Sequence, residues 1–181
     1  MEDWKKSYIF GTLVICPPKK VCSIVDALRE KYDPLSQAIM GAHITLTQPF
    51  LKEPTPQVWK EINKILSEFE IFPITYGPIE TFPSSSVIKF KIQQQNQILS
   101  LRNKLHQTGY FNLELPFTEG FIAHMTISEL VQRKPSAAKE LANQLNKDYD
   151  EGSFICKEIS YIRPDDDFHF QTKMEFQIGE R

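Results

Sequence analysis

The chain has 181 residues, of which 41% are hydrophobic and 24% are charged, proportions that suit a soluble globular fold. A formal net charge of −2 and a pI of about 6.1 argue against a long nucleic-acid groove, because extended duplex binding needs a marked basic excess. A small nucleotide or the end of one RNA strand remains a compatible ligand.

The length fits a single domain over residues 1–181, built from two intimately packed lobes. The three cysteines, at positions 16, 22 and 156, lack the spacing of metal ligands and argue against a disulfide scaffold. The N-terminus shows no signal-peptide pattern, and no apolar run reaches membrane-spanning length. We therefore expect a cytoplasmic monomer without a membrane segment.

Apolar spacing predicts the elements of the N-terminal half. The expected elements are a buried strand over 8–15, a helix over about 21–28 that ends before Asp33-Pro34, a strand over about 42–50, a helix begun by Thr55 with a stripe over 59–69, and a strand over 72–76 ending at Gly77-Pro78. The helices follow the i, i+3, i+4, i+7 spacing of amphipathic segments.

The C-terminal half repeats this plan. The expected elements are a strand over 87–92, a helix over 98–105 with Gly109 as its C-cap, an edge segment over 111–115, a strand over about 121–130, a helix over 138–145 capped by Ser136, a strand over 154–162, a turn over 164–167 and a strand over 168–176. The order strand, helix, strand, helix occurs in both halves and is a weak internal repeat. We expect an α+β fold with two pseudo-symmetric lobes of mainly antiparallel sheet, flanking helices and a central cleft.

The same short pattern occurs in both halves, as Ala42-His43-Ile44-Thr45-Leu46 and as Ala123-His124-Met125-Thr126-Ile127. The two histidines are 81 residues apart (124 − 43). Side chains two positions apart on a strand point to the same side. Each copy therefore presents one imidazole and one hydroxyl on one face and apolar side chains on the other.

These paired His-x-Thr strands resemble the two-histidine phosphoesterase superfamily, which includes bacterial 2′-5′ RNA ligase-like proteins and plant cyclic phosphodiesterases. The resemblance covers nearly the whole chain in length and element order. It implies a bilobal fold with both motifs lining the cleft, and metal-independent opening of 2′,3′-cyclic phosphates, with a role in RNA processing. It implies that His43 and His124 are catalytic, that Thr45 and Thr126 contact the phosphate, and that neither a metal nor a cofactor takes part.

The residue types suit this chemistry. An imidazole titrates near neutrality, so one ring can accept a proton from water while the other protonates the departing ribose oxygen. Threonine hydroxyls can donate to phosphate oxygens as negative charge builds. With a 5′-hydroxyl as nucleophile, the same site would ligate RNA. The expected partner is a small nucleotide or an RNA end bearing a cyclic phosphate, and which histidine is the base stays open.

Two other classes of function stay open: a non-catalytic module that senses a nucleotide or phosphate, and an interaction scaffold. A single histidine on an apolar strand is more often a hydrogen-bonded core residue than a catalyst. His106 near a helix C-terminus favours a structural role, and a cation is favoured there by the helix dipole. His169 is expected in water, and 165–167 is expected as a solvated turn rather than a metal site.

Two further predictions concern strand faces. Lys89 and Lys91 share one face of a strand and are expected to face water. The aromatic side chains of Tyr8, Phe10 and Tyr161 are candidates to wall a nucleotide base.

Overall fold

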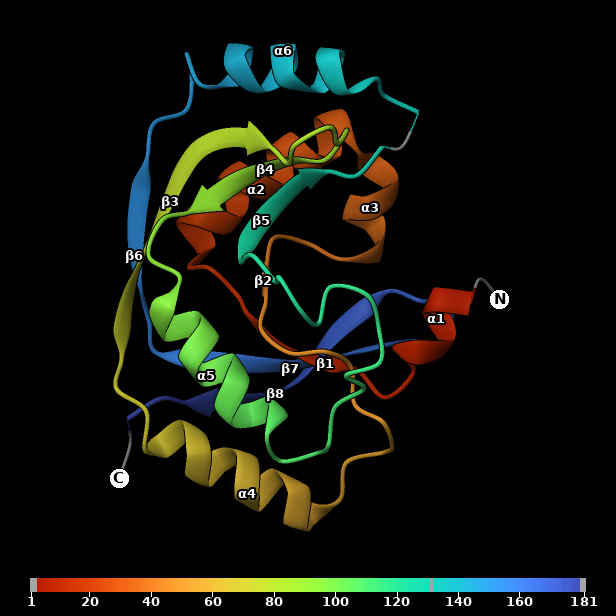
Figure 1. Ribbon diagram of the computed structural model, residues 1–181, viewed down its shortest axis with the longest axis vertical. Helices are drawn as coiled ribbons and strands as arrows, with labels where there is room; N and C mark the ends of the chain where they lie inside the picture. Colours follow the sequence, from red (N-terminus) through yellow and green to blue (C-terminus); the bar gives the residue numbers. More distant parts are fainter. Residues whose placement is uncertain (1–2, 131, 180–181) are drawn as a thin grey trace.

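The computed structural model describes residues 3–130 and 132–179 as six helices and one eight-stranded sheet (Figure 1). In chain order the elements are α1 Asp3–Ser7, β1 Thr12–Ile15, α2 Lys19–Tyr32, α3 Pro34–Ile39, β2 Ile44–Thr45, α4 Pro56–Ser67, β3 Phe72–Thr81, β4 Ile88–Ile92, α5 Asn96–His106, β5 His124–Ser128, α6 Pro135–Leu145, β6 Gly152–Cys156, β7 Glu158–Pro164 and β8 Phe170–Gln177.

The strand order is β6-β3-β4-β5-β2-β1-β7-β8, and every neighbouring pair is antiparallel. The two strands that carry the His-x-Thr pattern, β5 and β2, lie side by side at the centre. They divide the sheet into a β6-β3-β4-β5 half and a β2-β1-β7-β8 half. The order β1-α2-β2 in the first part of the chain is repeated as β4-α5-β5, which confirms the predicted pseudo-symmetry.

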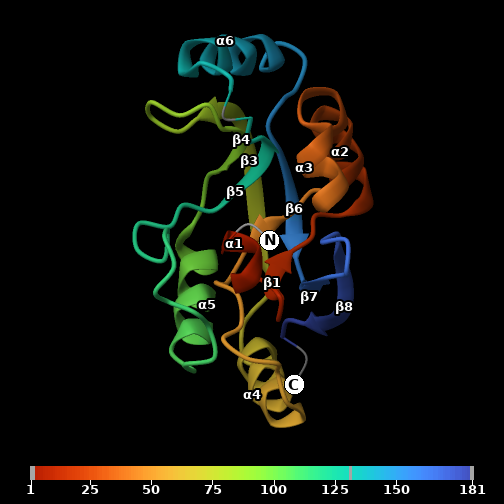
Figure 2. The same cartoon turned by 90° about the vertical axis from the view of Figure 1, so that its right-hand side faces the viewer.

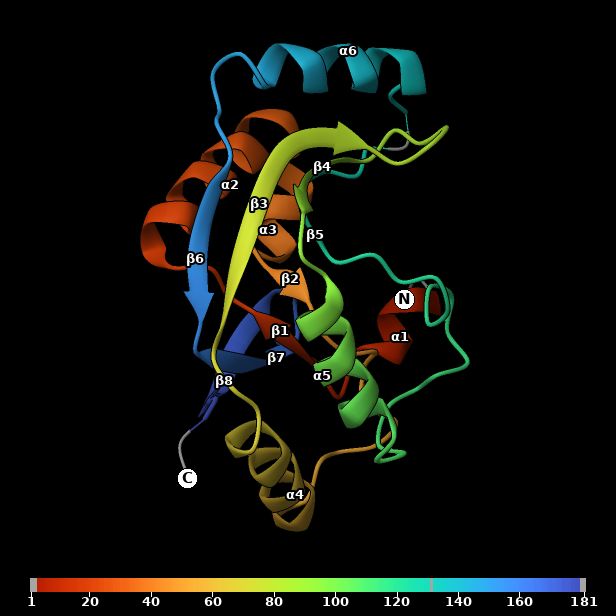
Figure 3. The ribbon, with the colours of Figure 1, turned by 60° about the vertical axis from the view of Figure 1, so that its left-hand side comes forward.

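The helices are shared between the two halves of the sheet. Helix α2 lies against β5 and α6 lies against β3 and β4, while α4 packs on β8 and on α5. Figures 1 and 2 show α2, α3 and α6 around one half and α4 and α5 around the other. The sheet is strongly curled, as the long bend of β3 in Figure 3 shows. The expected bilobal α+β fold class is confirmed.

The predicted helix stripes form much of the core. The buried helical residues include Val21, Val25 and Leu28 of α2, Ile62 and Leu66 of α4, and Ile98, Leu101 and Leu105 of α5. They belong to the same buried cluster as Ile44 and Met125 of the central strands. Burying each large aliphatic side chain contributes about 1.5–3 kcal/mol, so the stripes explain why these segments become helices against the sheet.

Several predicted strand boundaries were wrong. The strand expected over 42–50 pairs regularly only at Ile44–Thr45, because both Leu46 N and Thr47 N donate to the Leu13 carbonyl and the ladder loses its register. The strand expected over 8–15 begins at Thr12, after a turn at Gly11 with a φ of +74°. The strand expected over 154–162 is two strands in different halves of the sheet, β6 beside β3 and β7 beside β1.

Turn residues gave mixed results. Thr55 caps α4 as predicted, accepting a hydrogen bond from Val58 N at 3.4 Å. Gly77-Pro78 does not end β3 but forms an irregularity inside it. Ser136 does not cap α6, which begins at Pro135 after Lys134. Asp33 ends α2 as predicted but also caps the unpredicted helix α3, through its Oδ1 and Ser36 N.

The strand expected over 168–176 begins at Phe170 and is only partly buried. Phe176 is buried, whereas Thr172 and Met174 are exposed. The physical reason is position, because β8 is the terminal strand of the sheet.

Candidate functional site

The pairing of β2 with β5 brings the two motifs together. Ile44 is the partner of Met125 in this antiparallel ladder, so one step away His43 lies opposite Thr126 and Thr45 lies opposite His124. Ile44 and Met125 are fully buried on one face of the sheet. The four motif side chains therefore share the other face, which we call the motif face.

The four residues form a square array, with the histidines on one diagonal and the threonines on the other. Diagonal neighbours on an antiparallel pair are about 7–8 Å apart at their Cα atoms, a gap that side chains can bridge around one small ligand. His43, Thr45 and His124 are partly exposed, and Thr126 is nearly buried.

Each imidazole is tethered in the same way. His43 Nδ1 is 2.8 Å from the Gly41 carbonyl oxygen, and His124 Nδ1 is 2.7 Å from the Ile122 carbonyl oxygen. A carbonyl oxygen can only accept, so Nδ1 carries the proton in both rings. The lone pair of each neutral ring is then on Nε2, and the two rings offer the same nitrogen to a ligand.

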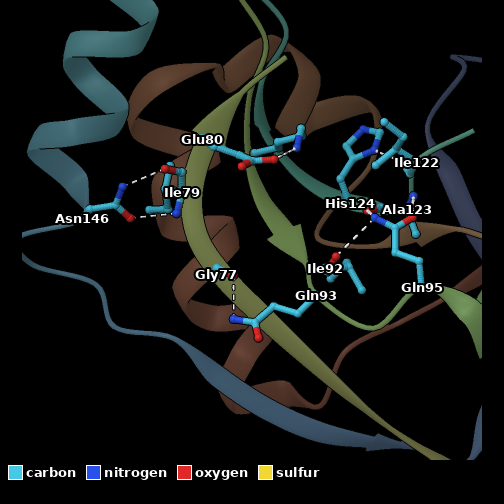
Figure 4. A network of polar contacts seen from close by, with 11 residues as sticks. Gly77, Ile79, Glu80, Ile92, Gln93, Gln95, Ile122, Ala123, His124 and Asn146 are labelled. Atoms are coloured by element: carbon cyan, nitrogen blue, oxygen red, sulfur yellow. Dashed lines mark hydrogen bonds and ion pairs between the residues drawn. The ribbon is translucent and has the colours of Figure 1, made fainter. Parts of the chain in front are cut away.

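A side chain from outside the motif holds the backbone just before each histidine. Asp26 Oδ1, on α2, accepts from Ala42 N at 2.6 Å. Gln95, next to the start of α5, accepts from Ala123 N at 2.8 Å and donates to the Ala123 and Ile92 carbonyls (Figure 4). The backbone that carries each tethering carbonyl is therefore fixed by an element of the same half of the chain.

Arg29 is a buried arginine that joins α2 to the second motif. Its Nη1 donates to the Thr126 carbonyl at 2.9 Å. Its other donors bind the Gln37 side chain and the Ser36 and Met40 carbonyls, all at 2.8–2.9 Å. The segment between α2 and β2 is thus bound to β5 by one guanidinium.

Arg102 on α5 has the corresponding position in the other half. It is buried, and its Nη1 donates to the Leu46 carbonyl beside the first motif at 2.7 Å. Its guanidinium carbon lies 3.9 Å from the centroid of the Phe121 ring, a cation–π contact. Each motif strand is therefore held by an arginine from the helix that precedes the other motif.

Both histidines lose affinity for protons in the folded protein. Burial lowers the pKa of His43 to about 4, helped by the positive charges of Arg29 and His124 and opposed by the Gly41 carbonyl. Burial also lowers the pKa of His124, with a further contribution from Lys89. Without a ligand, both rings are neutral near pH 7.

Two lysines of β4 flank the second motif. The register places Lys89 opposite Thr126 and Lys91 opposite His124, on the motif face. The prediction that both face water was wrong for Lys89, which is 1% exposed, and correct for Lys91. Lys89 Nζ is 2.5 Å from Glu80 Oε1 and 4.3 Å from the centroid of the Phe82 ring.

Phe82 connects this ion pair to the motif. Its ring meets the His124 ring edge to face, with the centroids 5.1 Å apart. Phe82 and Glu80 also line a pocket of about 440 Å³ between residues 79–85 and α6, which includes Lys139 and Asn143 but none of the four motif residues.

The neighbours of the first motif on β1 are uncharged. Val14 of β1 lies opposite Thr45, and Cys16 lies one step beyond Ile15, beside His43. Burial raises the pKa of the Cys16 thiol, which therefore stays protonated and is a poor nucleophile.

The other candidate residues lie away from the motifs or have structural contacts. His106 is buried, and its Nε2 accepts from Gln48 N at 3.0 Å. Burial and the charge of Arg102 lower the pKa of His106 to about 4, and its hydrogen bond agrees with the predicted structural role. His169 is exposed, as predicted, and its Nδ1 lies 3.8 Å from Oδ1 of Asp165.

The aromatic prediction was wrong for Tyr161. Its ring is buried against Phe50 and Trp59, and its hydroxyl donates to the Phe10 carbonyl at 2.9 Å. A side chain inside the core cannot wall a base.

Within residues 3–130 and 132–179, no three His, Cys, Asp or Glu side chains are grouped so as to hold a metal ion. No helix in the same part of the chain is long and apolar enough to cross a membrane.

No sequence pattern indicated Asp26, Arg29, Gln95 or Phe82 as residues that contact the motifs. Asp26 and Arg29 lie on a helix whose apolar stripe was recognised, but polar positions between stripe residues are usually solvated. Only Phe82 could have been noticed in the sequence, because it is an aromatic residue between Thr81 and Pro83, next to a loop with three serines.

Comparison with known proteins agrees with this arrangement. A family model described as the 2′-5′ RNA ligase superfamily matches residues 17–168, which include both motifs. The protein OB1230 of Oceanobacillus iheyensis is 31% identical over 120 residues, which cover 65% of this chain and 68% of that protein. It bears the provisional name of a phosphoesterase, without a stated substrate.

Solved structures share the fold. TT0787 of Thermus thermophilus superposes with a TM-score of 0.60 at 14% identity, over 93% of this chain and 97% of that one. Escherichia coli LigT complexed with NADP+ superposes with a TM-score of 0.56 at 17% identity, over 92% and 95% of the two chains.

Proposed function

The chain belongs to the 2′-5′ RNA ligase superfamily of two-histidine phosphoesterases, and we propose that it opens 2′,3′-cyclic phosphates on nucleotides or RNA ends by acid–base catalysis without a metal. The observation that carries this proposal is the square array of two tethered imidazoles and two threonines on the motif face. Phosphate and 3′-AMP, both of which have been seen bound to E. coli LigT, are of the chemical class that this array suits.

In the proposed reaction, His43 and His124 act through their Nε2 atoms. One Nε2 accepts a proton from water as the water oxygen bonds to phosphorus. The other donates its proton to the ribose oxygen as the bond from that oxygen to phosphorus breaks. The hydroxyls of Thr45 and Thr126, on the other diagonal, donate to the non-bridging phosphate oxygens. One imidazole gains a proton and the other loses one, so the pair as a whole keeps its proton count while the ring-opened phosphomonoester forms.

The low pKa values of the histidines are compatible with an acid in this reaction once an anion is bound. A negative charge about 4 Å from an imidazolium stabilises it by about 4 kcal/mol at an effective dielectric constant near 20. That energy corresponds to about three pH units. A bound phosphate therefore raises a pKa near 4 to about neutrality, and the substrate itself makes one ring available as the acid.

With an RNA 5′-hydroxyl in place of water, the same proton transfers would join two RNA ends, through a 2′-5′ linkage when the 3′ oxygen is the leaving group. Water is far more concentrated than any RNA end, so we propose hydrolysis as the main reaction. A second candidate function is a sensor of nucleotides, since two tethered imidazoles and two threonines on one face can bind an anion without transferring a proton.

The test is turnover of 2′,3′-cyclic nucleotides and of RNA ending in a cyclic phosphate, followed by phosphorus NMR. His43→Ala and His124→Ala should each lower kcat/KM by about 10²–10⁴-fold, the usual contribution of one proton-transfer group. A chelator should have no effect, and the exposed His169→Ala is the matched control.

Near-normal turnover by either histidine variant would contradict the catalytic roles. Tight binding of nucleoside monophosphates without any product would support the sensor instead.

A further inference from the structure

Lys91 places a positive charge on the motif face, and this charge forms no ion pair among the described residues. This residue lies opposite His124 in the β4–β5 ladder and is exposed. Among the described residues its ammonium has no hydrogen-bond or ion-pair partner, whereas the charge of Lys89 is matched by Glu80. Directly opposed side chains on antiparallel strands have Cβ atoms about 4.5–5.5 Å apart, so Lys91 and His124 are immediate neighbours.

The strand on the other side of Lys91 leaves it free. The β3–β4 ladder pairs Tyr76 with Ile92 and Ile79 with Phe90, so the irregularity at Gly77-Pro78 lies opposite Lys91. Neither of these two residues carries a charge or a side-chain donor. The Glu151 carboxylate, which lies beside Gly77, accepts a hydrogen bond from Gln93 Nε2 at 2.7 Å and forms no ion pair with Lys91. The lysine therefore has a flexible four-carbon stem and an ammonium that is unpaired among the described residues.

The pseudo-equivalent neighbours of the first motif lack such a charge. Val14 and Cys16 occupy the corresponding places beside Thr45 and His43 on β1. Val14 is buried, and the Cys16 thiol stays uncharged. An anion bound on the motif face thus meets a cation on its β4 side and uncharged groups on its β1 side.

We propose that Lys91 forms a subsite for a second phosphate of the substrate, next to the cyclic phosphate at His43 and His124. This inference rests on the proposed function and narrows it, because the preferred substrates are 2′,3′-cyclic nucleotides that carry another phosphate. It also orients them, with the second phosphate over β4 and the uncharged part of the nucleoside toward β1. A lysine binds phosphate as a point charge, so the subsite accepts a diester or a monoester.

Three substrates test the proposal: adenosine 2′,3′-cyclic phosphate, the same compound with a 5′-phosphate, and a dinucleotide that ends in a 2′,3′-cyclic phosphate. Lys91→Ala should lower the preference for a second phosphate, measured as a ratio of kcat/KM values, by about tenfold. It should also reduce the slope of log KM against log salt by about one for those substrates. Lys91→Arg should keep the preference.

Lys173→Ala is the matched control, because Lys173 is an exposed strand lysine on β8, at the far edge of the sheet from β4. If Lys91→Ala lowers kcat/KM only for the 5′-phosphate compound, the second phosphate of the substrate is a terminal monoester. If it lowers kcat/KM only for the dinucleotide, the second phosphate is an RNA diester. An equal decrease in kcat/KM on all three substrates, or no decrease on any, overturns the subsite.

Equilibrium binding separates this inference from the proposed function. Calorimetry should show that Lys91→Ala weakens adenosine 3′,5′-bisphosphate about tenfold more than adenosine 3′-phosphate. If the wild-type protein opens no cyclic phosphate, the catalytic proposal fails while this comparison still decides the role of Lys91. If Lys91→Ala weakens the binding of both ligands equally, the proposed role of Lys91 is overturned.

Discussion

The two histidines of the motif face are held by the same backbone arrangement but have different neighbouring side chains. In both halves, a histidine is tethered through Nδ1 to the carbonyl two residues before it, and a side chain from the same half of the chain holds the residue in between. Around His43, the sheet neighbours are Val14 and Cys16. Around His124, they are Lys89 and Lys91.

This difference teaches that a repeat can preserve the same arrangement of histidine and threonine while its two copies are chemically distinct. Nε2 is presented identically by the tethers, but the proton affinity of each ring depends on burial and on nearby charge. His43 has the buried Arg29 nearby, whereas His124 has Lys89 and the Phe82 ring. The two imidazoles are therefore not interchangeable, and the following changes should separate the two halves.

The largest expected effect is on the free energy of unfolding, which should differ between variants of Arg29 and Arg102. Arg29→Met removes donors from four acceptors and a buried charge near Asp26 and Asp33, and should lower the free energy of unfolding by about 3–5 kcal/mol. Arg102→Met removes one hydrogen bond and one cation–π contact, and should cost about 1–3 kcal/mol. Urea unfolding at pH 7 measures both.

The comparison of the arginines would fail if Arg102→Met cost as much as Arg29→Met. Arg163→Met is the control, since its ion pair with Glu53 is exposed and should contribute no more than about 1 kcal/mol.

Protonation of His43 in acid should cost more stability than protonation of His124. The pKa of His43 is about 4 when folded and about 6.5 when unfolded, so the unfolded state binds the proton more tightly. The stability this ring contributes is complete above pH 6.5 and is lost as the pH falls through 6.5 toward 4, by up to about 3 kcal/mol. His43→Gln should therefore reduce the loss of stability between about pH 7.5 and pH 4.5 more than His124→Gln does.

NMR titration of the two ring Cε1–H signals checks the same point directly. His43 should remain neutral to a lower pH than His124. Identical titration midpoints would show that their surroundings do not distinguish the two rings.

The residues that hold the backbone before each histidine should differ in strength. Asp26→Ala removes a carboxylate acceptor from Ala42 N and should cost about 1.5–3 kcal/mol, because hydrogen bonds to charged groups are the stronger ones. Gln95→Ala removes neutral hydrogen bonds and should cost about 0.5–1.5 kcal/mol. Amide hydrogen exchange should increase at Ala42 in the first variant and at Ala123 in the second, and the reverse pattern would contradict these contacts.

The smallest expected effect concerns Phe82. Phe82→Leu removes the edge-to-face contact with His124, which contributes about 0.5–1.5 kcal/mol beyond burial. Because the ring also shields His124 from water, the variant should raise the pKa of His124 toward its ordinary value. The pKa of His43 serves as the internal control, and an equal rise in both would contradict a local role for Phe82.

The sequence by itself determined the local features of this protein. The apolar stripes predicted α2, α4 and α5, and the alternation in both motifs predicted that each histidine shares a face with its threonine. These predictions succeed because helix and strand periods are set by neighbouring residues along the chain. The resemblance carried by the two motifs also predicted the bilobal α+β fold.

Tertiary structure alone decided how those features are combined. Pairing between strands set the square array, the shortness of β2 and the division of 154–162 into strands of different halves. It also buried Lys89 while leaving Lys91 exposed, although both lie on one face of the same strand. Register and burial depend on residues far apart in the chain, so no local pattern could distinguish the two lysines or the surroundings of the two histidines.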